Sequence, residues 1–244
     1  MSKLEQFASG ALVHGRHVQT QNWERLVWGD PKANRLGSLP TLARVILEES
    51  KDRPITTIVM GTGASERDGR KEAEVMKGFL LDNFDKLGQF PTFREHIGLQ
   101  TVAARDILEG RLHHIITETT SQNTDQEVAA AAKVFAEHGV TFVSQITAAS
   151  HAPRSMLVQS AAREAGAIPA DQRWSLVADD MTFGDGPVRD VTVLEPPHRG
   201  DDPAIGWQQT YNQAAKGYFG LSQEGQQGLI AMIDSYVQAQ HEQH

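Results

Sequence analysis

The feature of this sequence that most constrains its fold is a regular alternation of short β-branched runs with longer helical patterns. Runs of this kind predict strands, and they lie at 11–14, 55–60, 114–117, 140–147, 174–178 and 190–194. Apolar residues with the 3.6-residue period of a helix fall between them, at 38–50, 69–83, 100–109, 124–138 and 153–165. Strands separated by helices of this length pair in parallel through right-handed crossovers. The sequence therefore predicts a three-layer α/β fold with a mostly parallel central sheet.

The helix predicted over 124–138 has the clearest local signals. Thr124 is placed to cap its first turn, and Glu127 is placed to reach back to it, which makes a capping box. Gly139 can end the helix. One face of this helix is apolar, at Val128, Ala131, Ala132 and Phe135.

We expect a single domain over residues 1–244 with two additions. Residues 84–110 contain Gly88, Pro91 and Gly98 and predict a helical or loop insertion. Residues 195–244 predict an extension, a loop followed by a C-terminal helix over about 222–240. The apolar positions of that helix predict packing within the chain or, as the alternative, a homodimer face.

Composition excludes several classes of protein. The sequence has no cysteine, so it has neither disulfides nor thiolate metal sites. Its net charge of −8 argues against nucleic acid as a partner. No apolar run has the length of about 20 residues that crosses a bilayer, and the first residues are too polar for a secretory signal. We therefore expect a cytoplasmic protein without a membrane partner.

Ligands of an open parallel sheet bind beyond the carboxyl ends of its strands. The predicted strand at 55–60 is followed by Gly61 and Gly63. Because glycine has no side chain, the backbone N–H groups there can approach an anion closely. Glu66 stands where the dinucleotide-binding fingerprint requires its third glycine, so that motif is absent. The structural alternative is a tight turn between a strand and a helix.

Two further strand ends are rich in polar groups. The segment from Glu118 to Thr124 contains Ser121 and Asn123 and leads into a helix N-terminus, which suits an oxyanion. The alternative there is plain capping. The third strand end is followed by polar and charged groups at Ser150, His151 and Arg154. Histidine can move a proton near neutral pH and arginine can bind phosphate or carboxylate; the alternative is a pair of ordinary surface residues.

The remaining histidines carry less weight. His14 at the end of the first strand is placed to line the same pocket, whereas His113 and His114 start a strand and are expected to be structural. His198 has acidic neighbours, but a metal site needs several ligands that converge in space. No metal site is predicted.

The order of these three turns along the chain resembles that of the bacterial YdcF/SanA/ElyC family. The resemblance covers roughly residues 10–195. The most specific parts of the resemblance are the Glu-x-x-Ser-x-Asn-Thr-x-x-Glu stretch, residues 118–127, and the His-x-x-Arg stretch, residues 151–154. The other matches are Gly15, Arg35, Gly61, Gly63, Glu72, Ala73, Met76 and Ser150. The sequence departs from the family pattern in a longer 84–110 segment, in Val-His-Gly at the first strand, and in Ser155 where alanine is usual.

The resemblance implies a Rossmann-like fold with a polar cleft at the strand ends, and S-adenosylmethionine as a cofactor or ligand. Because some members are anchored in the cell envelope, the absence of an anchor makes this chain similar to the soluble branch. The catalytic candidates are His151, Glu118 and Arg154. The ligand-binding candidates are Gly15, Arg35, Gly61, Gly63, Glu72, Ser121, Asn123, Thr124 and Ser150.

The leading hypothesis is therefore a protein for a small anionic or nucleotide-like molecule, phosphorylated or adenosyl, which acts as a hydrolase or transferase. In that hypothesis His151 is the acid or base, and Ser121 is its potential nucleophilic partner. The first alternative is a metabolite-sensing module without turnover. The second is a purely structural or interaction protein.

Overall fold

The computed structural model describes residues 8–20, 22–49, 53–97 and 101–181, together with 222, 224–225, 227–229 and 231–232. The chain divides into two compact units, residues 1–192 and 193–244. In the second unit the described residues from 224 to 232 are helical, and Met232 is exposed. The predicted strand at 190–194, the loop at 195–210, His198 and most of the 222–240 helix lie outside the described residues.

The first unit is built on a five-stranded parallel sheet, as the sequence predicts. The strand order is β7-β4-β1-β8-β9. The strands are β1 (Ala8–Val13), β4 (Ile55–Gly61), β7 (Ile116–Glu118), β8 (Val140–Thr147) and β9 (Arg173–Ala178). Each corresponds to one of the β-branched runs, so the Rossmann-like α/β sandwich is confirmed.

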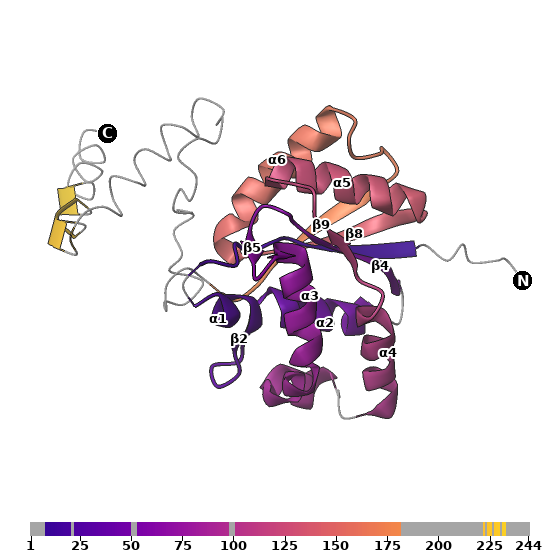
Figure 1. Ribbon diagram of the computed structural model, residues 1–244, viewed down its shortest axis with the longest axis horizontal. Helices are drawn as coiled ribbons and strands as arrows, with labels where there is room; N and C mark the ends of the chain where they lie inside the picture. Colours follow the sequence, from indigo (N-terminus) through magenta and orange to yellow (C-terminus); the bar gives the residue numbers. More distant parts are fainter. Residues whose placement is uncertain are drawn as a thin grey trace, which may run out of the picture. The chain divides into compact units, whose positions relative to one another are not determined.

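Helices cover both faces of the sheet (Figure 1). One face carries α1 (Trp23–Trp28), α2 (Ser38–Glu49), α3 (Glu72–Asp82) and α4 (Val102–Leu112). The other face carries α5 (Thr124–Glu137) and α6 (Ala152–Glu164). Within the described residues, no helix has the length and apolar character that a bilayer crossing requires.

The hydrophobic core is split by the sheet into two clusters. In β1, Ala11 and Val13 belong to the cluster under α1–α4, whereas Leu12 belongs to the cluster under α5 and α6. This alternation follows from the two-residue period of a strand. A strand buried on both faces needs apolar residues at every position, which is why β1 appears in the sequence as a continuous apolar run.

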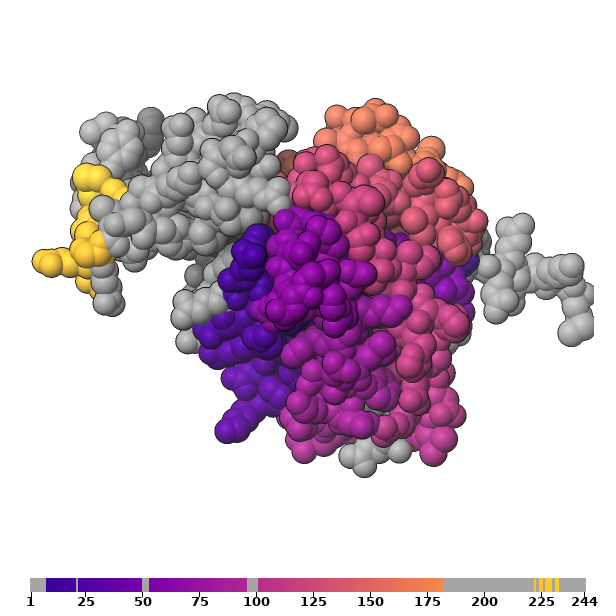
Figure 2. All heavy atoms as spheres, in the orientation of Figure 1, coloured from indigo at the N-terminus to yellow at the C-terminus, as the bar shows by residue number. Residues whose placement is uncertain are grey.

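The described residues of the 84–110 segment, 84–97 and 101–110, are packed into the first unit. They form a 3-10 turn, η1 (Phe84–Gln89), a π-helical turn, η2 (Thr92–Ile97), and most of α4. Leu87, Phe90 and Phe93 are fully buried in the larger core cluster. In Figure 2 the residues from about 70 to 112, coloured from purple to magenta, form much of the face in view.

Three short elements have no counterpart in the sequence-based prediction. They are α1 and two hairpins of two-residue strands, β2 (Gly29–Asp30) with β3 (Arg35–Leu36) and β5 (Glu66–Arg67) with β6 (Arg70–Lys71). Strands of two residues are too short to show a period. The local signal lies in the turn instead: Asp68 and Gly69 both have positive φ and form the two-residue Asp-Gly turn between β5 and β6.

The strand order fixes where a ligand site belongs. The chain leaves β1 toward β4 on one side and later returns to place β8 on the other side of β1. A crevice opens at such a switch point, beyond the carboxyl ends of the two strands. In this chain those ends are His14, which follows β1, and residues 148–151, which follow β8.

Candidate functional site

The turns after β4 and β7 are hydrogen-bonded to each other. The Gly63 backbone N–H donates to the Ser121 carbonyl oxygen at 2.9 Å, and the Thr62 hydroxyl donates to the same oxygen. A Cβ at position 63 would lie 1.9 Å from the Thr119 carbonyl oxygen. Glycine at 63 is therefore needed for the two turns to meet.

Glu118 holds the second of these turns in shape. Its carboxylate accepts hydrogen bonds from the backbone N–H groups of Thr120 at 2.8 Å and Ser121 at 3.0 Å, and from the Thr120 hydroxyl. Burial alone would raise the pKa of Glu118, but the hydrogen bonds from Ser121 and Thr120 outweigh it and lower the pKa below its ordinary value. Glu118 is therefore ionised at neutral pH and stabilises the turn through hydrogen bonds, which makes it a poor proton donor.

The start of α5 differs from the capping box that the sequence predicts. Asn123, not Thr124, is the N-cap, and its side-chain oxygen accepts from the Gln126 N–H at 3.0 Å. The Glu127 side chain does not reach back to the cap. Its carboxylate instead binds the end of β1, accepting from His14 Nδ1 at 2.6 Å and from the Gly15 N–H at 3.1 Å.

His14 and Glu127 form a buried pair at the switch point. Both residues are less than 5 % exposed. When the Gln145 amide N–H donates to His14 Nε2 at 2.6 Å, His14 Nδ1 is the ring nitrogen that donates to Glu127. The ring is therefore fixed between a carboxylate on α5 and an amide on β8.

Two glycines allow the backbone to approach these carboxylates. A Cβ on Gly15 would lie 2.1 Å from Glu72 Oε1, and a Cβ on Gly61 would lie 2.7 Å from Glu127 Oε1. Glu72 is itself buried and accepts a hydrogen bond from the Ser65 hydroxyl. The end of β1 is thus enclosed by carboxylates from α3 and α5.

The turn after β8 brings the third predicted cluster to the same place. The His151 ring centroid lies 6.0 Å from that of His14, and His151 Nε2 lies 3.3 Å from the Thr124 hydroxyl. His151 and Arg154, in the first turn of α6, are both half-buried. Ser150 is buried, and within the described part of the chain its hydroxyl has no hydrogen-bond partner.

Asp179, after β9, ties this turn to the segment that follows β1. Its Oδ1 accepts from the Met181 N–H at 3.0 Å and the Ala149 N–H at 3.4 Å, and its Oδ2 lies 3.8 Å from the Arg16 guanidinium. Burial raises the pKa of Asp179 to about 7, against the opposing effects of Arg16 and the two backbone hydrogen bonds. The carboxyl can therefore exchange a proton near neutral pH.

Most of the predicted residues come together at this edge. Hydrogen bonds and close contacts connect Gly15, Gly61, Gly63, Glu72, Ser121, Thr124 and His151. Arg35 lies in the β2–β3 hairpin, which is attached at Leu36 to Asp180 beyond β9. The predicted Ser121–His151 pair is not formed among the described hydrogen bonds, where His151 instead meets Thr124.

Several residues of the site are not among the candidates that the sequence predicts. The sequence places Glu127 in a capping box and in the stretch 118–127 that resembles the family, but not among the site candidates; Gln145, Arg16 and Asp179 are not predicted at all. Gln145 did carry a signal, because it is a polar side chain inside an apolar strand. Asp179 and Arg16 follow strand ends, but only the three-dimensional structure brings them together.

Among the described residues, no group of three or more histidine and acidic side chains is arranged to hold a metal ion. Comparisons with family models, curated proteins and solved structures found no match to this chain. The function must therefore be argued from the geometry of the site.

Proposed function

We propose that the protein binds a small anionic or nucleotide-like ligand, phosphorylated or adenosyl, at the carboxyl edge of the sheet and acts on it as a hydrolase or transferase. The observation that carries the proposal is the convergence at the switch point of the His14–Glu127 pair and His151, with ring centroids 6.0 Å apart. Titratable groups gathered at the edge where ligands of this fold bind are typical of functional sites.

The roles follow from chemistry. Arg154 and the N-terminal turn of α6 provide positive charge for a phosphate or carboxylate. The Ser150 hydroxyl, buried without a partner among the described residues, supplies a further hydrogen bond. His151, half-buried beside Thr124, serves as the acid or base. His14 and Glu127 orient the surrounding backbone.

The similarity to the YdcF/SanA/ElyC family supports an adenosyl ligand in particular, and S-adenosylmethionine is the first compound to test. Native mass spectrometry of freshly purified protein would identify a co-purifying molecule. Titration calorimetry with S-adenosylmethionine, nucleotides and sugar phosphates would then measure its affinity.

Arg154→Ala should weaken binding of an anionic ligand by at least about tenfold, since a charged hydrogen bond contributes about 1.5–3 kcal/mol. Arg163→Ala, at the far end of the same helix, is the matched control and should bind normally. Failure of every compound to bind, or equal affinity in the two variants, would refute the proposal.

A second candidate is a metabolite-sensing module that binds the same ligand without turning it over. The hydrogen bond of His151 to Thr124, in place of the predicted partner Ser121, favours it. Turnover assays on a panel of phosphoesters separate the two: hydrolysis that is lost in His151→Gln and kept in His138→Gln supports the enzyme, whereas binding without turnover supports the sensor.

A further inference from the structure

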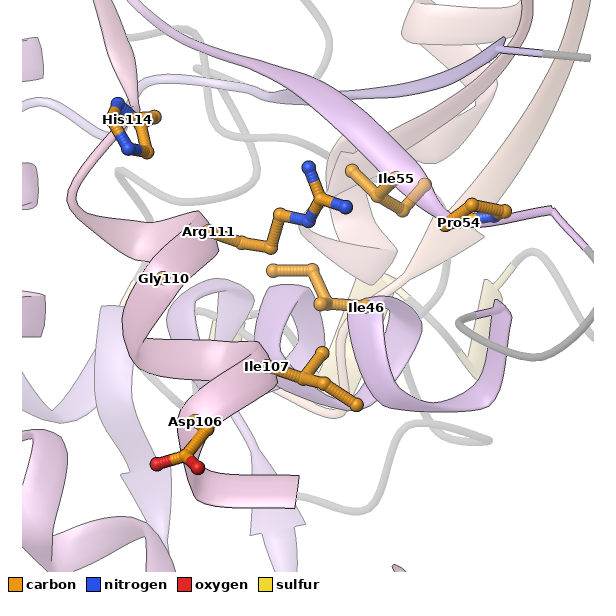
Figure 3. A pocket seen from close by; sticks show the side chains of 8 residues that line it. All are labelled: Ile46, Pro54, Ile55, Asp106, Ile107, Gly110, Arg111 and His114. Carbon is orange, nitrogen blue, oxygen red and sulfur yellow. The ribbon is translucent and has the colours of Figure 1, made fainter. Parts of the chain in front are cut away.

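A pocket of about 410 Å³ opens at the opposite edge of the sheet from the candidate site (Figure 3). It lies between the second half of α2, the start of β4 and the end of α4. Among the described residues, its lining consists of Ile46, Pro54, Ile55, Asp106, Ile107, Gly110, Arg111 and His114. A volume of this size falls within the range of small-molecule sites, about 300–1,000 Å³.

The pocket combines an apolar floor with a cationic side chain, Arg111. Ile46 and Ile55 belong to the core and are each 1 % exposed, whereas Ile107 is 40 % exposed at the rim. The Arg111 side chain extends over Ile46 toward Ile55, while the Asp106 carboxylate points away from it (Figure 3). Within the described residues, the Arg111 guanidinium has neither a salt bridge nor a hydrogen bond.

Gly110 forms part of the pocket wall. It lies inside α4, where glycine is less stable than alanine. A Cβ at this position would meet no atom within 4 Å, so packing does not require glycine there. The missing side chain leaves the wall of the pocket open beside Arg111.

We propose that this pocket is a second binding site, for a small amphipathic monoanion of the aliphatic carboxylate class. Its apolar chain packs on the 40 % exposed Ile107, above the buried Ile46 and Ile55, and its carboxylate pairs with Arg111. Polar groups that fix orientation in a mostly apolar hollow are typical of small-molecule sites, and the planar guanidinium matches a carboxylate with two parallel hydrogen bonds.

This site is independent of the proposed function. β4 starts at the pocket with Ile55 and ends at the candidate site with Gly61. At about 3.3 Å for each residue, the two lie roughly 20 Å apart. Either site can thus fail its test without affecting the other.

The test is an NMR titration of the full chain with octanoate, with 1-octanol as the uncharged comparison. Octanoate should shift the amides of Ile55, Ile107 and Arg111 in a saturable manner and should bind at least about tenfold more tightly than octanol. Absence of saturable shifts, equal affinity for octanol, or shifts only around Gly61 and His151 would overturn the proposal.

Two pairs of variants, each a test and its control, locate the binding. Arg111→Gln should weaken octanoate binding at least about tenfold, and Arg105→Gln, on the same helix, should leave it unchanged. Gly110→Phe should fill the pocket and abolish binding, whereas Gly110→Ala should retain it, with folding of both checked by circular dichroism. Wild-type affinity in Gly110→Phe, or equal loss in both arginine variants, would rule out this pocket as the site.

Discussion

At the scale of single residues, Glu127 joins α5 to the end of β1. It is 3 % exposed and accepts hydrogen bonds from His14 Nδ1 and the Gly15 N–H. A buried donor that loses its acceptor costs about 1–3 kcal/mol. Both donors depend on this one carboxylate.

Glu127→Ala should therefore lower the free energy of unfolding by about 2–4 kcal/mol, measured by urea denaturation. Glu127→Gln keeps an acceptor and should lose less. Glu137→Ala, exposed on the same helix, is the control and should stay within about 0.5 kcal/mol of wild type. Equal stability of the two alanine variants would contradict the assigned role.

Asp179 makes a prediction about pH. Its pKa is about 7 in the folded chain and about 3.9 when unfolded. Between these values the folded chain holds a proton that the unfolded chain releases. The free energy of unfolding therefore falls as the pH rises through this window, by at most about 1.4 kcal/mol for each pH unit.

Asp179→Asn removes this titration while keeping the shape of the side chain. The stability of wild type relative to the variant should fall between about pH 4 and about pH 7 and then level off. Urea denaturation of both proteins across this range measures it. A difference that does not change with pH would show that Asp179 is already ionised at the lower end.

At the scale of elements, the turns after β4 and β7 depend on Gly63. Gly63→Ala would force its Cβ against the Thr119 carbonyl oxygen and should destabilise the fold by about 1–3 kcal/mol. Gly110→Ala meets no such obstacle and should stabilise α4 by about 0.5–1 kcal/mol. Thermal unfolding of both variants tests the contrast, and shifts of the same sign would contradict it.

The elements show how far sequence reasoning reaches. The β-branched runs located the five strands, and the 3.6-residue period located five of the helices, each of which is long enough to display it. The six-residue helix α1 has an N-cap, Asn22, in the left-handed conformation and no side-chain cap, so it left no signal. The spacing of Glu127 from Thr124 predicts a capping box, whereas its actual partners, His14 and Gly15, lie more than a hundred residues away. The turns after β4, β7 and β8 converge because of the strand order. The sequence does not state this order; it follows only from general rules for parallel sheets.

At the scale of the whole first unit, β1 is paired on both sides, whereas β9 has one described neighbour, β8. Residues in β1 are almost all buried, and those of β9 are exposed or half-buried. Hydrogen exchange followed by mass spectrometry should find the β1 amides the slowest and those of β9 at least about tenfold faster, because exchange reports local opening. Equal protection of the two strands would contradict this ranking.

The place of β1 also bears on the synthesis of the protein. Ala8 pairs with Val140, and Val13 pairs with Ile146. A ribosome releases the first strand long before its second neighbour exists, and contacts so distant along the chain form slowly. During translation β1 must wait, with one edge unpaired, until most of the described sheet has been made. Contact with chaperones or with other nascent chains should matter most in that interval.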